Sequence, residues 1–541
     1  MWNTTDHFAT LGRVGISHQL LRDGVVSSLV PPESHDRPVE KPFRDLIEER
    51  AVTRERAAWL LGARVNQQVS YRQVRERTRD WANVFSSVGL RDGDRVGLLV
   101  SDPLEFGTCF VSALAYGLWV APLDPTLEYP NGQTLDERAT RLHLNAIVSD
   151  RAAPVALSTT WIDLHDGSSG DTASDDMPSP NGGGVILATS GTTGTPKIMA
   201  LPVAQLVYAA DLIARHNELT TVDRGFNPLP LWHVNAEVVA LLATFLSGSS
   251  LVLDDGFHRT DFWSLMDRLE VTWINAVPAI ISRLVTRHGD EAIPQRVRFI
   301  RSASAPLSGP LLEAFEAQTN IVVVESYGMT EAASQICANP LRGPRKRGSV
   351  GPAVGVQLRV IASPISSRAD AHHPGHVEIR GASVIKRYEG DGYEDRFDPE
   401  GWLRTGDLGY LDEDDYLFLV GRSDDVINRG GEKIFPREIE DVILGVPGVL
   451  GAAVIGAADE VFHQVPVAFV QLENVTSSTP LDAIRTVTAQ IRNELAVTFV
   501  RTRRPVELNV VVHLPVNATG KVKKGELLDD TVEIITRESL Q

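Results

Sequence analysis

The residues from Thr189 to Lys197, TSGTTGTPK, are the first that could do chemistry, and they directly follow the strand-like run VILA. Small hydroxyl and glycine residues let backbone N–H groups approach phosphate oxygens closely, and the hydroxyls add donors. The lysine at the end supplies a positive charge for terminal phosphates. A Walker A loop needs Gly-Lys-Ser/Thr in succession, whereas a proline precedes Lys197 here. The segment therefore predicts a phosphate-binding loop of another type, with a plain Ser/Thr/Gly surface loop as the alternative.

Further short motifs follow along the chain. They are LWHVN at 231–235, SAPL at 304–307, SYGMTE at 326–331, TGDLG at 405–409, GRSDD at 421–425, NRGGEKI at 428–434 and GK at 520–521. Together with the loop, they resemble in type and order the superfamily of acyl-CoA synthetases, peptide-synthetase adenylation domains and luciferases. Each motif is weak alone, but the ordered set is specific. The residues of these motifs and of the segments around them look most like those of oxalyl-CoA synthetases. The chain is thus identified as similar to adenylate-forming enzymes.

The resemblance implies ATP, Mg²⁺ and coenzyme A as cofactors, and it assigns the nucleotide site by position. Tyr327 is the face for adenine, Thr330 a phosphate donor, Glu331 the magnesium ligand, Asp407 the ribose acceptor and Arg422 a ribose or phosphate contact. Taken alone, Thr330 or Glu331 could cap a helix, Asp407 could form an Asx turn and Arg422 could be a solvated surface charge. The remaining predicted nucleotide contacts lie in loops and turns: Thr189, Ser190, Gly191, Thr192, Thr193, Gly194, Ser304, Ala305, Pro306 and Gly328.

Enzymes of this type run two half-reactions, and the resemblance places Lys521 in the first. A carboxylate must attack the α-phosphorus of ATP, and a cation between the two anions offsets a repulsion of about 4 kcal/mol at close range. For the second, the C-terminal domain is expected to rotate about Asp424 and to present the strand with Gly430 and Gly431 to the pantetheine channel. A plain Gly-Gly turn is the alternative for those glycines.

The acid pocket is predicted from the same likeness. Trp232, His233 and Val234 fall where the family has an aromatic-His gate beside the acyl group, although a core histidine would explain His233 as well. A dicarboxylic acid would need an added cation, for which Arg283 and Arg301 are the candidates; either could instead pair with a local carboxylate. Apolar neighbours favour a nonpolar or natural-product acid.

One position departs from the family pattern. The family continues its phosphate loop as Pro-Lys-Gly, whereas Lys197 is followed by Ile198. A β-branched residue is stiffer than glycine and does not share its dihedral range. The departure raises the alternative of a variant that accepts a preformed acyl-adenylate from a partner enzyme.

The elements that must position these residues read as α/β. Amphipathic helical stretches alternate with short buried strand-like runs from 42 to 350, and short strands and turns near 375–420 predict a small β-rich subdomain. With 541 residues, the chain is too long for one core. We expect a large N-terminal domain over 1–422 and a smaller, mobile α+β C-terminal domain over 423–541.

Composition limits the partners and the compartment. The formal net charge of −18 argues against nucleic acid or an anionic membrane as a general partner. Two isolated cysteines make neither a disulfide framework nor a zinc site, and the first residues lack the pattern of a signal peptide. We therefore expect a cytoplasmic protein.

The sequence predicts an AMP-forming acid–thiol ligase that joins a carboxylic acid to CoA through an acyl-AMP intermediate. Four alternatives stay open: the non-adenylating variant, an enzyme that loads a separate carrier protein, a luciferase-like oxygenase, and a nucleotide-binding protein without turnover.

Overall fold

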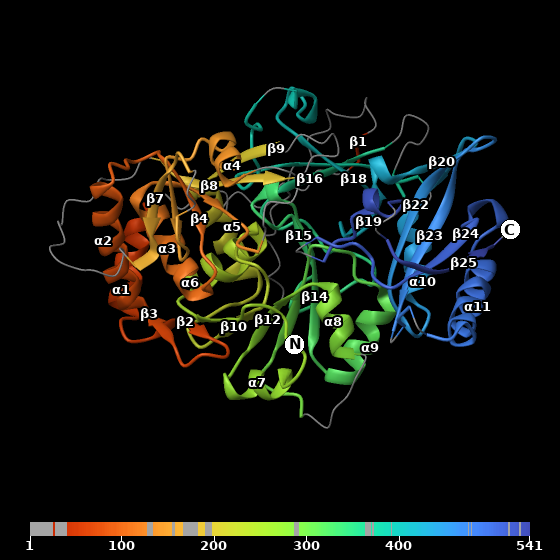
Figure 1. Cartoon of the computed structure of the whole chain (residues 1–541), viewed down its shortest axis with the longest axis horizontal. Helices are drawn as coiled ribbons and strands as arrows, with labels where there is room; N and C mark the ends of the chain where they lie inside the picture. Colours follow the sequence, from red (N-terminus) through yellow and green to blue (C-terminus); the bar gives the residue numbers. More distant parts are fainter. Residues whose placement is uncertain are drawn as a thin grey trace, which may run out of the picture.

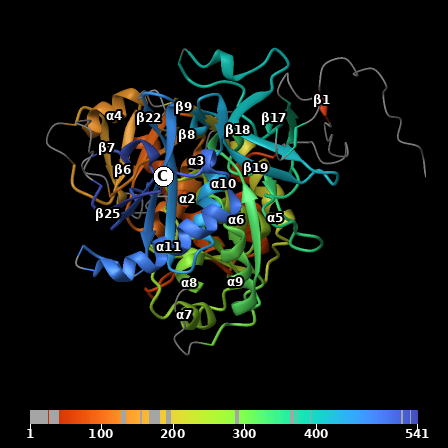
Figure 2. The same cartoon turned by 90° about the vertical axis from the view of Figure 1, so that its right-hand side faces the viewer.

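The computed structural model describes residues 25–26, 41–126, 134–153, 157–165, 182–189, 197–285, 292–362, 369–370, 373–390, 392–473, 475–477, 479–517, 520–529 and 532–540. A large domain, coloured from orange to teal, occupies the left and centre of Figure 1, and a smaller C-terminal domain in blue lies at the right. Turned by 90°, the blue elements stand in front of the large domain (Figure 2).

Two sheets form the body of the large domain. The first is mostly parallel and has the strand order β15 (Cys337–Ala338), β14 (Val322–Tyr327), β13 (Phe299–Ser302), β12 (Trp273–Ala276), β10 (Arg224–Asn227), β11 (Ser250–Leu253), β2 (Ala58–Gly62) and β3 (Gln68–Ser70). The second has the order β7 (Thr160–Asp163), β6 (Ala146–Ser149), β4 (Arg95–Leu99), β5 (Trp119–Pro122), β8 (Gly184–Thr189) and β9 (Lys197–Pro202).

Apolar helices fill the space between these sheets. Helix α3 (Pro103–Tyr116) contacts β2 of one sheet and β4 and β5 of the other, and its residues from Phe106 to Tyr116 are all buried. A helix that is apolar all round belongs inside a protein, which explains the run FGTCFVSALAY. Asp102 starts this helix by accepting hydrogen bonds from the backbone N–H groups of Leu104 and Glu105. Cys109 lies in this helix and is fully buried.

The other helices of the large domain cover the sheets or bridge them. They are α1 (Phe43–Thr53), α2 (Tyr71–Ser87), α4 (Leu135–Arg141), α5 (Val203–His216), the π-helix η2 (Asn235–Leu242), α6 (Ala243–Ser247), α7 (Phe262–Arg268), α8 (Pro278–Val285) and α9 (Gly309–Thr319). Helix α5 contacts β8 and β9, and η2 contacts β10 and β12, so this pair joins the two sheets behind the site described below.

The predicted β-rich subdomain is confirmed as an antiparallel sheet. Its order is β1 (Val25–Val26), β16 (Gln357–Ile361), β17 (Gly375–Arg380), β18 (Leu403–Leu411) and β19 (Leu417–Arg422). The short turn η5 (Ser423–Asp425) leads from β19 into the smaller domain.

The C-terminal domain is α+β, as expected. Its sheet has the order β21 (Glu432–Ile434), β20 (Ile427–Arg429), β23 (His463–Leu472), β24 (Glu507–Val511) and β25 (Ile534–Ser539), with β22 (Val449–Asp459) also paired to β23. Helices α10 (Pro436–Leu444) and α11 (Leu481–Thr498) pack on it around a separate core that includes Ile439, Ile443 and Ile491. None of the helices in the described ranges is long and apolar enough to cross a membrane.

Candidate active site

The end of β14 and the middle of β18 bring together a tyrosine, a carboxylate and an arginine. The Tyr327 hydroxyl donates a hydrogen bond to Asp407 Oδ2, and Arg422 Nη1 donates to Asp407 Oδ1 over 3.2 Å. The backbone N–H of Asp407 donates to the Thr405 hydroxyl (3.0 Å), which donates to the carbonyl of Val377 (2.9 Å). Three residues that the sequence predicted separately therefore meet at one carboxylate.

The electrostatics of this trio favour a neutral phenol and a charged guanidinium. Burial raises the pKa of Tyr327, and the negative charge of Asp407 raises it further. Burial acts to lower the pKa of Arg422, but the Asp407 carboxylate outweighs it, so that the pKa lies above its ordinary value. A carboxylate has about four acceptor sites. Two are used here by Tyr327 and Arg422, which leaves about two for a ligand.

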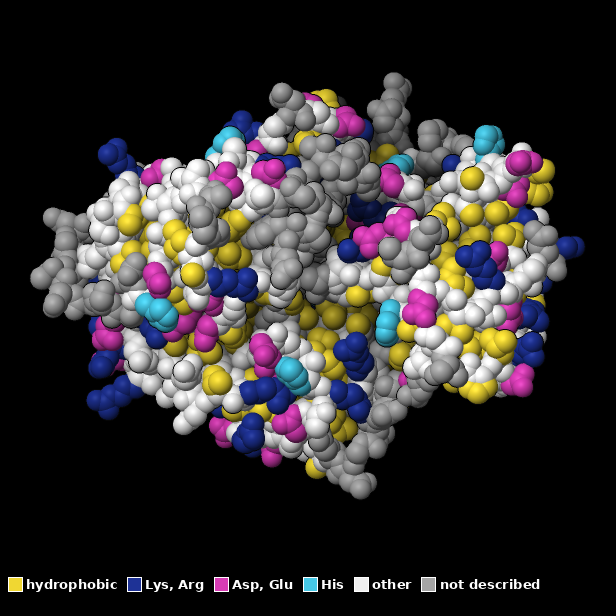
Figure 3. Space-filling view, in the orientation of Figure 1, with side chains coloured by type: hydrophobic (Ala, Val, Ile, Leu, Met, Phe, Trp, Pro, Cys, Tyr) yellow, Lys and Arg dark blue, Asp and Glu magenta, His cyan; other side chains and the backbone are white. Residues whose placement is uncertain are grey.

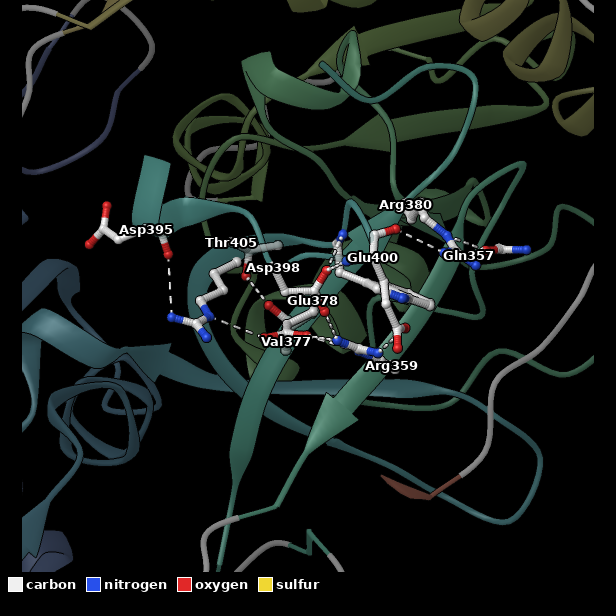
Figure 4. Close-up of polar contacts among 11 residues, drawn as sticks. Gln357, Arg359, Val377, Glu378, Arg380, Asp395, Asp398, Glu400 and Thr405 are labelled. Atoms are coloured by element: carbon white, nitrogen blue, oxygen red, sulfur yellow. Dashed lines mark hydrogen bonds and ion pairs between the residues drawn. The ribbon is translucent and has the colours of Figure 1, made fainter. Parts of the chain in front are cut away.

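A network of ion pairs fixes the subdomain that carries Asp407. Arg359 pairs with both Glu378 and Asp398 (Figure 4). Its Nη2 lies 2.7 Å from Glu378 Oε2 and 2.5 Å from Asp398 Oδ2, and its guanidinium stacks 4.3 Å from the centroid of the Trp402 ring. Burial acts to raise the pKa of Asp398, but hydrogen bonds from the Trp402 N–H and from Arg359 hold it below its ordinary value. Paired in this way, β16 and β17 make a firm support for β18.

A second carboxylate, Glu331, lies on the short turn η3 (Thr330–Ala332) directly after β14. It is buried, and the Tyr388 hydroxyl donates to its Oε1 over 2.8 Å. Lys197 Nζ stands 5.6 Å from the centroid of the Tyr388 ring and 5.4 Å from that of Tyr393. Burial lowers the pKa of Lys197, and so does the positive charge of Arg396, while Glu331 opposes them. A lysine, a carboxylate and two aromatic rings therefore share one place.

This place opens to solvent. A hollow of about 540 Å³ lies beside it and is lined by residues 387–390, Tyr393, Glu394 and Phe397. In the space-filling view, acidic and basic side chains lie side by side on the surface near the C-terminal domain at the right (Figure 3). The region can therefore take a ligand that carries negative charge and needs a carboxylate partner as well.

The predicted phosphate loop is only partly seen. Ser190, Gly191, Thr192, Thr193 and Gly194 lie outside the described residues, and of Thr189 only the backbone is described, as the last residue of β8. Thr189 pairs with Lys197 across β8 and β9. Ile198 follows in the same strand, where its carbonyl accepts a hydrogen bond from the backbone N–H of Glu389 (2.8 Å) and its side chain packs on an apolar cluster. An extended strand suits a β-branched residue.

The loops after β13 and β14 supply the remaining predicted contacts. Ser304 has a left-handed backbone (φ 72°) and, with Ala305 and Pro306, follows β13 on the accessible side. Gly328 follows Tyr327 with no room for a side chain, because a Cβ there would meet the Ser334 carbonyl oxygen at 1.3 Å. The glycine predicted from the motif is therefore required by the packing of this turn.

The segment that was predicted to line an acid pocket precedes the π-helix η2. Trp232 and His233 are partly buried and Val234 is buried. Burial lowers the pKa of His233, with a smaller opposite effect from Asp124, and its Nε2 meets no partner in the described part of the chain. Asn235 follows and accepts a hydrogen bond from Asn275 at the end of β12.

The loop with Lys521 reaches the large domain. A methyl group placed on Gly520 would lie 3.9 Å from Val277 Cγ2 and 3.8 Å from Ala279 Cβ, so the loop rests beside the β12–α8 junction. The Lys521 side chain is exposed, and its backbone N–H donates to Asn517 Oδ1 (2.9 Å). Asp424 is exposed on η5, and Gly430 and Gly431 form the exposed turn between β20 and β21.

Sequence reasoning missed Tyr388. Its segment, IKRYEGDGYED, shows no pattern of hydroxyl, glycine or charge that marks a site, and only the fold brings its hydroxyl to Glu331. The predicted residues Tyr327, Asp407 and Arg422 are in mutual contact, as Glu331 and Lys197 are with Tyr388. Gly430 lies instead beside Phe462 of its own domain, and the backbone N–H of Gly431 donates to Asn428 Oδ1 (3.1 Å).

Comparison with known proteins gives two adjacent family matches. A model described as AMP-binding enzyme matches residues 47–389, and one described as AMP-binding enzyme C-terminal domain matches residues 438–521. A sulfoacetate–CoA ligase of Cupriavidus necator is 33% identical over 471 residues, covering 82% of this chain and 89% of its own. An oxalate–CoA ligase of Arabidopsis thaliana is 31% identical over 476 residues, with coverages of 82% and 89%. The crystal structure of ATP-bound MatB from Rhodopseudomonas palustris matches with a TM-score of 0.78 at 26% identity, covering 90% of this chain and 98% of that one.

Proposed function

Because the chain belongs to the AMP-binding enzyme family, we propose that it is an acyl-CoA ligase that works through an acyl-adenylate. The observation that carries this proposal is the meeting of Tyr327, Asp407 and Arg422 near Tyr388, which contacts both Glu331 and Lys197. One group of residues can hold a ribose and the other a charged phosphate chain, and the hollow of about 540 Å³ that residues of the large domain line lies beside the second group.

The nucleotide would bind across these two groups. Adenine lies against the Tyr327 ring, flanked by Gly328 and residues 304–306, and the two ribose hydroxyls donate to the free acceptor sites of Asp407. Lys197, the Thr330 hydroxyl and the 189–194 loop take the phosphates. Glu331 fits a magnesium ion, because its carboxylate is a hard oxygen ligand and Tyr388 holds one of its oxygens in place. When bound, Mg²⁺ neutralises charge on the phosphates.

Lys521 supplies the cation for the first half-reaction. An oxygen of the acid attacks the α-phosphorus of ATP, the bond to pyrophosphate breaks, and acyl-AMP forms. The closeness of Gly520 to Val277 and Ala279 supports this role, because it brings the lysine loop to the start of α8, next to β12. In the second half-reaction the CoA sulfur attacks the acyl carbon, and AMP leaves with the bonding electrons.

The second half-reaction requires a different arrangement of the domains. We infer a boundary at residues 422–423 and a hinge at Asp424, which is exposed on the connecting turn η5. Rotation there withdraws Lys521 and brings Gly430 and Gly431 to the site, where the absence of side chains admits pantetheine. The exposed position of this turn is what such a motion needs.

The position of Ile198 supports an intact first half-reaction. It lies within β9, in an extended conformation, so the substitution of glycine by isoleucine leaves the strand and the place of Lys197 intact. The variant that only accepts preformed acyl-adenylate, the loading of a carrier protein, the oxygenase and the non-catalytic protein remain the alternatives. The relatives are named for different acids, sulfoacetate and oxalate, and their names therefore do not identify the acid that this chain uses.

The test uses the purified chain with Mg²⁺, CoA and a panel of carboxylic acids, with ATP in one arm and preformed acyl-adenylates in the other. Acyl-CoA in both arms, detected by mass spectrometry, supports the proposal; product from the adenylates alone supports the non-adenylating variant. Lys521→Ala serves as the matched variant, and we expect it to lose about a hundredfold or more in the ATP arm only. The neighbouring exposed Lys523→Ala is the control and should behave as wild type.

A further inference from the structure

Arg301, in strand β13, is a buried cation that has no counter-ion among the residues that the structure describes. Its side chain is 1% exposed, which places it among the largest fully buried side chains. Nη2 donates to Gln335 Oε1 over 3.3 Å, while Nε and Nη1 meet no acceptor within the described ranges. Burial lowers its pKa to about 10, so the group is still charged at neutral pH. An unpaired buried charge costs several kcal/mol of stability, and something should offset that cost.

The neighbours of Arg301 add more unused polar groups. Asn275 stands beside it in register on β12, and donates to Asn227 Oδ1 (2.9 Å) and Asn235 Oδ1 (2.8 Å). Gln335 Nε2 and Asn275 Oδ1 are also buried without a partner in the described part of the chain. We call Arg301, Gln335 and Asn275 the Arg301 cluster. Three of the four atoms without a partner in this cluster carry N–H donors, and such an excess of donors over acceptors suits the binding of an anion.

The Arg301 cluster is linked through its chain neighbours to the segments of the proposed active site. Asn235, bonded to Asn275, directly follows Trp232, His233 and Val234. Val277, two residues beyond Asn275, is one of the two residues on which Gly520 rests. Gln335 lies four residues after Glu331. The cluster therefore sits at the carboxyl ends of β12 and β13, the same ends that the lysine loop approaches.

We propose that the Arg301 cluster binds a second anionic group of the acid substrate, a carboxylate or a sulfonate, while the first carboxylate is activated near Lys521. The proposal rests on the acyl-CoA ligase function proposed above and names its substrate class. Nε and one Nη of a guanidinium form a planar fork that matches two oxygens of such a group, and Gln335 Nε2 offers a further donor. The expectation of a nonpolar acid, drawn from the sequence, is replaced by this proposal.

A structural role for Arg301 makes a different prediction about stability. If Arg301 held the fold together, its removal would lower the stability of the protein. Replacing a buried arginine that has no counter-ion by an apolar side chain of similar length does not lower stability, because the replacement removes the cost of desolvating the charge. Arg301→Met is therefore expected to unfold at the same or a higher temperature than wild type, and yet to lose its preference for diacids.

The experiment compares kcat/KM for acyl-CoA formation on matched acids: malonate against propionate, and succinate against butyrate. Wild type should prefer the diacid of each pair, and Arg301→Met should reduce kcat/KM for diacids by about 10²–10³-fold while keeping that for monoacids. Arg301→Lys, which keeps the charge without the fork, should fall between them. Arg298→Met is the matched control: Arg298 precedes the same strand, is paired with Asp223 (2.7 Å), and should lose stability without changing acid preference.

Two results would overturn the inference: an Arg301→Met enzyme with the wild-type acid preference, or one that unfolds at a lower temperature and loses both acids equally. Failure of the ligase function itself is distinguished by the wild type, which would then form no acyl-CoA from any acid. In that case, the binding of malonate and succinate to wild type and to Arg301→Met is measured by calorimetric titration. Binding that wild type shows and Arg301→Met lacks supports the cluster, and equal or absent binding refutes it.

Discussion

Asp407→Asn tests the nucleotide site at its central residue. The carboxylate has about four acceptor sites, of which Tyr327 and Arg422 use two. An asparagine of the same shape has one oxygen, and its two lone pairs are taken if it faces those donors. Its NH₂ group then faces the ribose hydroxyls and offers them hydrogen-bond donors, although these hydroxyls need an acceptor. Two charge-assisted hydrogen bonds are lost, each worth about 1.5–3 kcal/mol.

A loss of about 3 kcal/mol or more corresponds to about a hundredfold or more in KM for ATP. The assay is acid-dependent exchange of pyrophosphate into ATP, with ATP compared to 2′-deoxy-ATP. Wild type should discriminate against the deoxynucleotide by about tenfold or more, since one hydroxyl is missing, and Asp407→Asn should discriminate little. Asp414→Asn is the control, because Asp414 lies on the same subdomain, is largely exposed and pairs with Lys346. If Asp407→Asn kept the discrimination of wild type, the assignment of Asp407 to the ribose would be wrong.

Three further predictions concern other parts of the molecule. Tyr388→Phe removes the donor that holds Glu331, and should raise the Mg²⁺ concentration for half-maximal exchange by about tenfold or more, measured by titration; an unchanged requirement contradicts a metal at Glu331. Burial raises the pKa of Glu325 to about 7 from an ordinary 4.5, opposed by Arg437 of the C-terminal domain. Between pH 4.5 and 7, Glu325 stays protonated in the folded protein but is ionised in the unfolded chain. Its contribution to the free energy of unfolding should therefore fall by up to about 3 kcal/mol as the pH rises from 4.5 to 7. Glu325→Gln should make the free energy of unfolding in urea fall less steeply than in wild type over this pH range, and a slope equal to that of wild type would assign the effect to other groups. Ile198→Gly should lower stability by about 1 kcal/mol or more and leave exchange no faster than in wild type; faster exchange would mean that Ile198 does limit adenylation.

Much of this protein was determined by local sequence. Alternation of helical and strand-like stretches predicted the α/β class, and the ordered motifs predicted the family that the two family matches confirm. Both follow from short-range patterns: hydrophobic periodicity reports the faces of single elements, and turns with Gly, Thr and Asp keep their spacing because a ligand touches several consecutive atoms.

Tertiary structure decided what neighbouring strands place together. Arg301 looked like either a pocket cation or a partner of a local carboxylate, and only the pairing of β12 with β13 shows it buried beside Asn275 with no carboxylate in contact among the described residues. Tyr388 reaches Glu331 across 57 positions, and Ile198 in β9 forms an isolated antiparallel bridge with Glu389, which is still more distant in the sequence. Such contacts cannot be predicted from local sequence, since sheet pairing and burial depend on where distant segments pack. Burial in turn decides whether a charged side chain is solvated by water or is available to pair with a ligand.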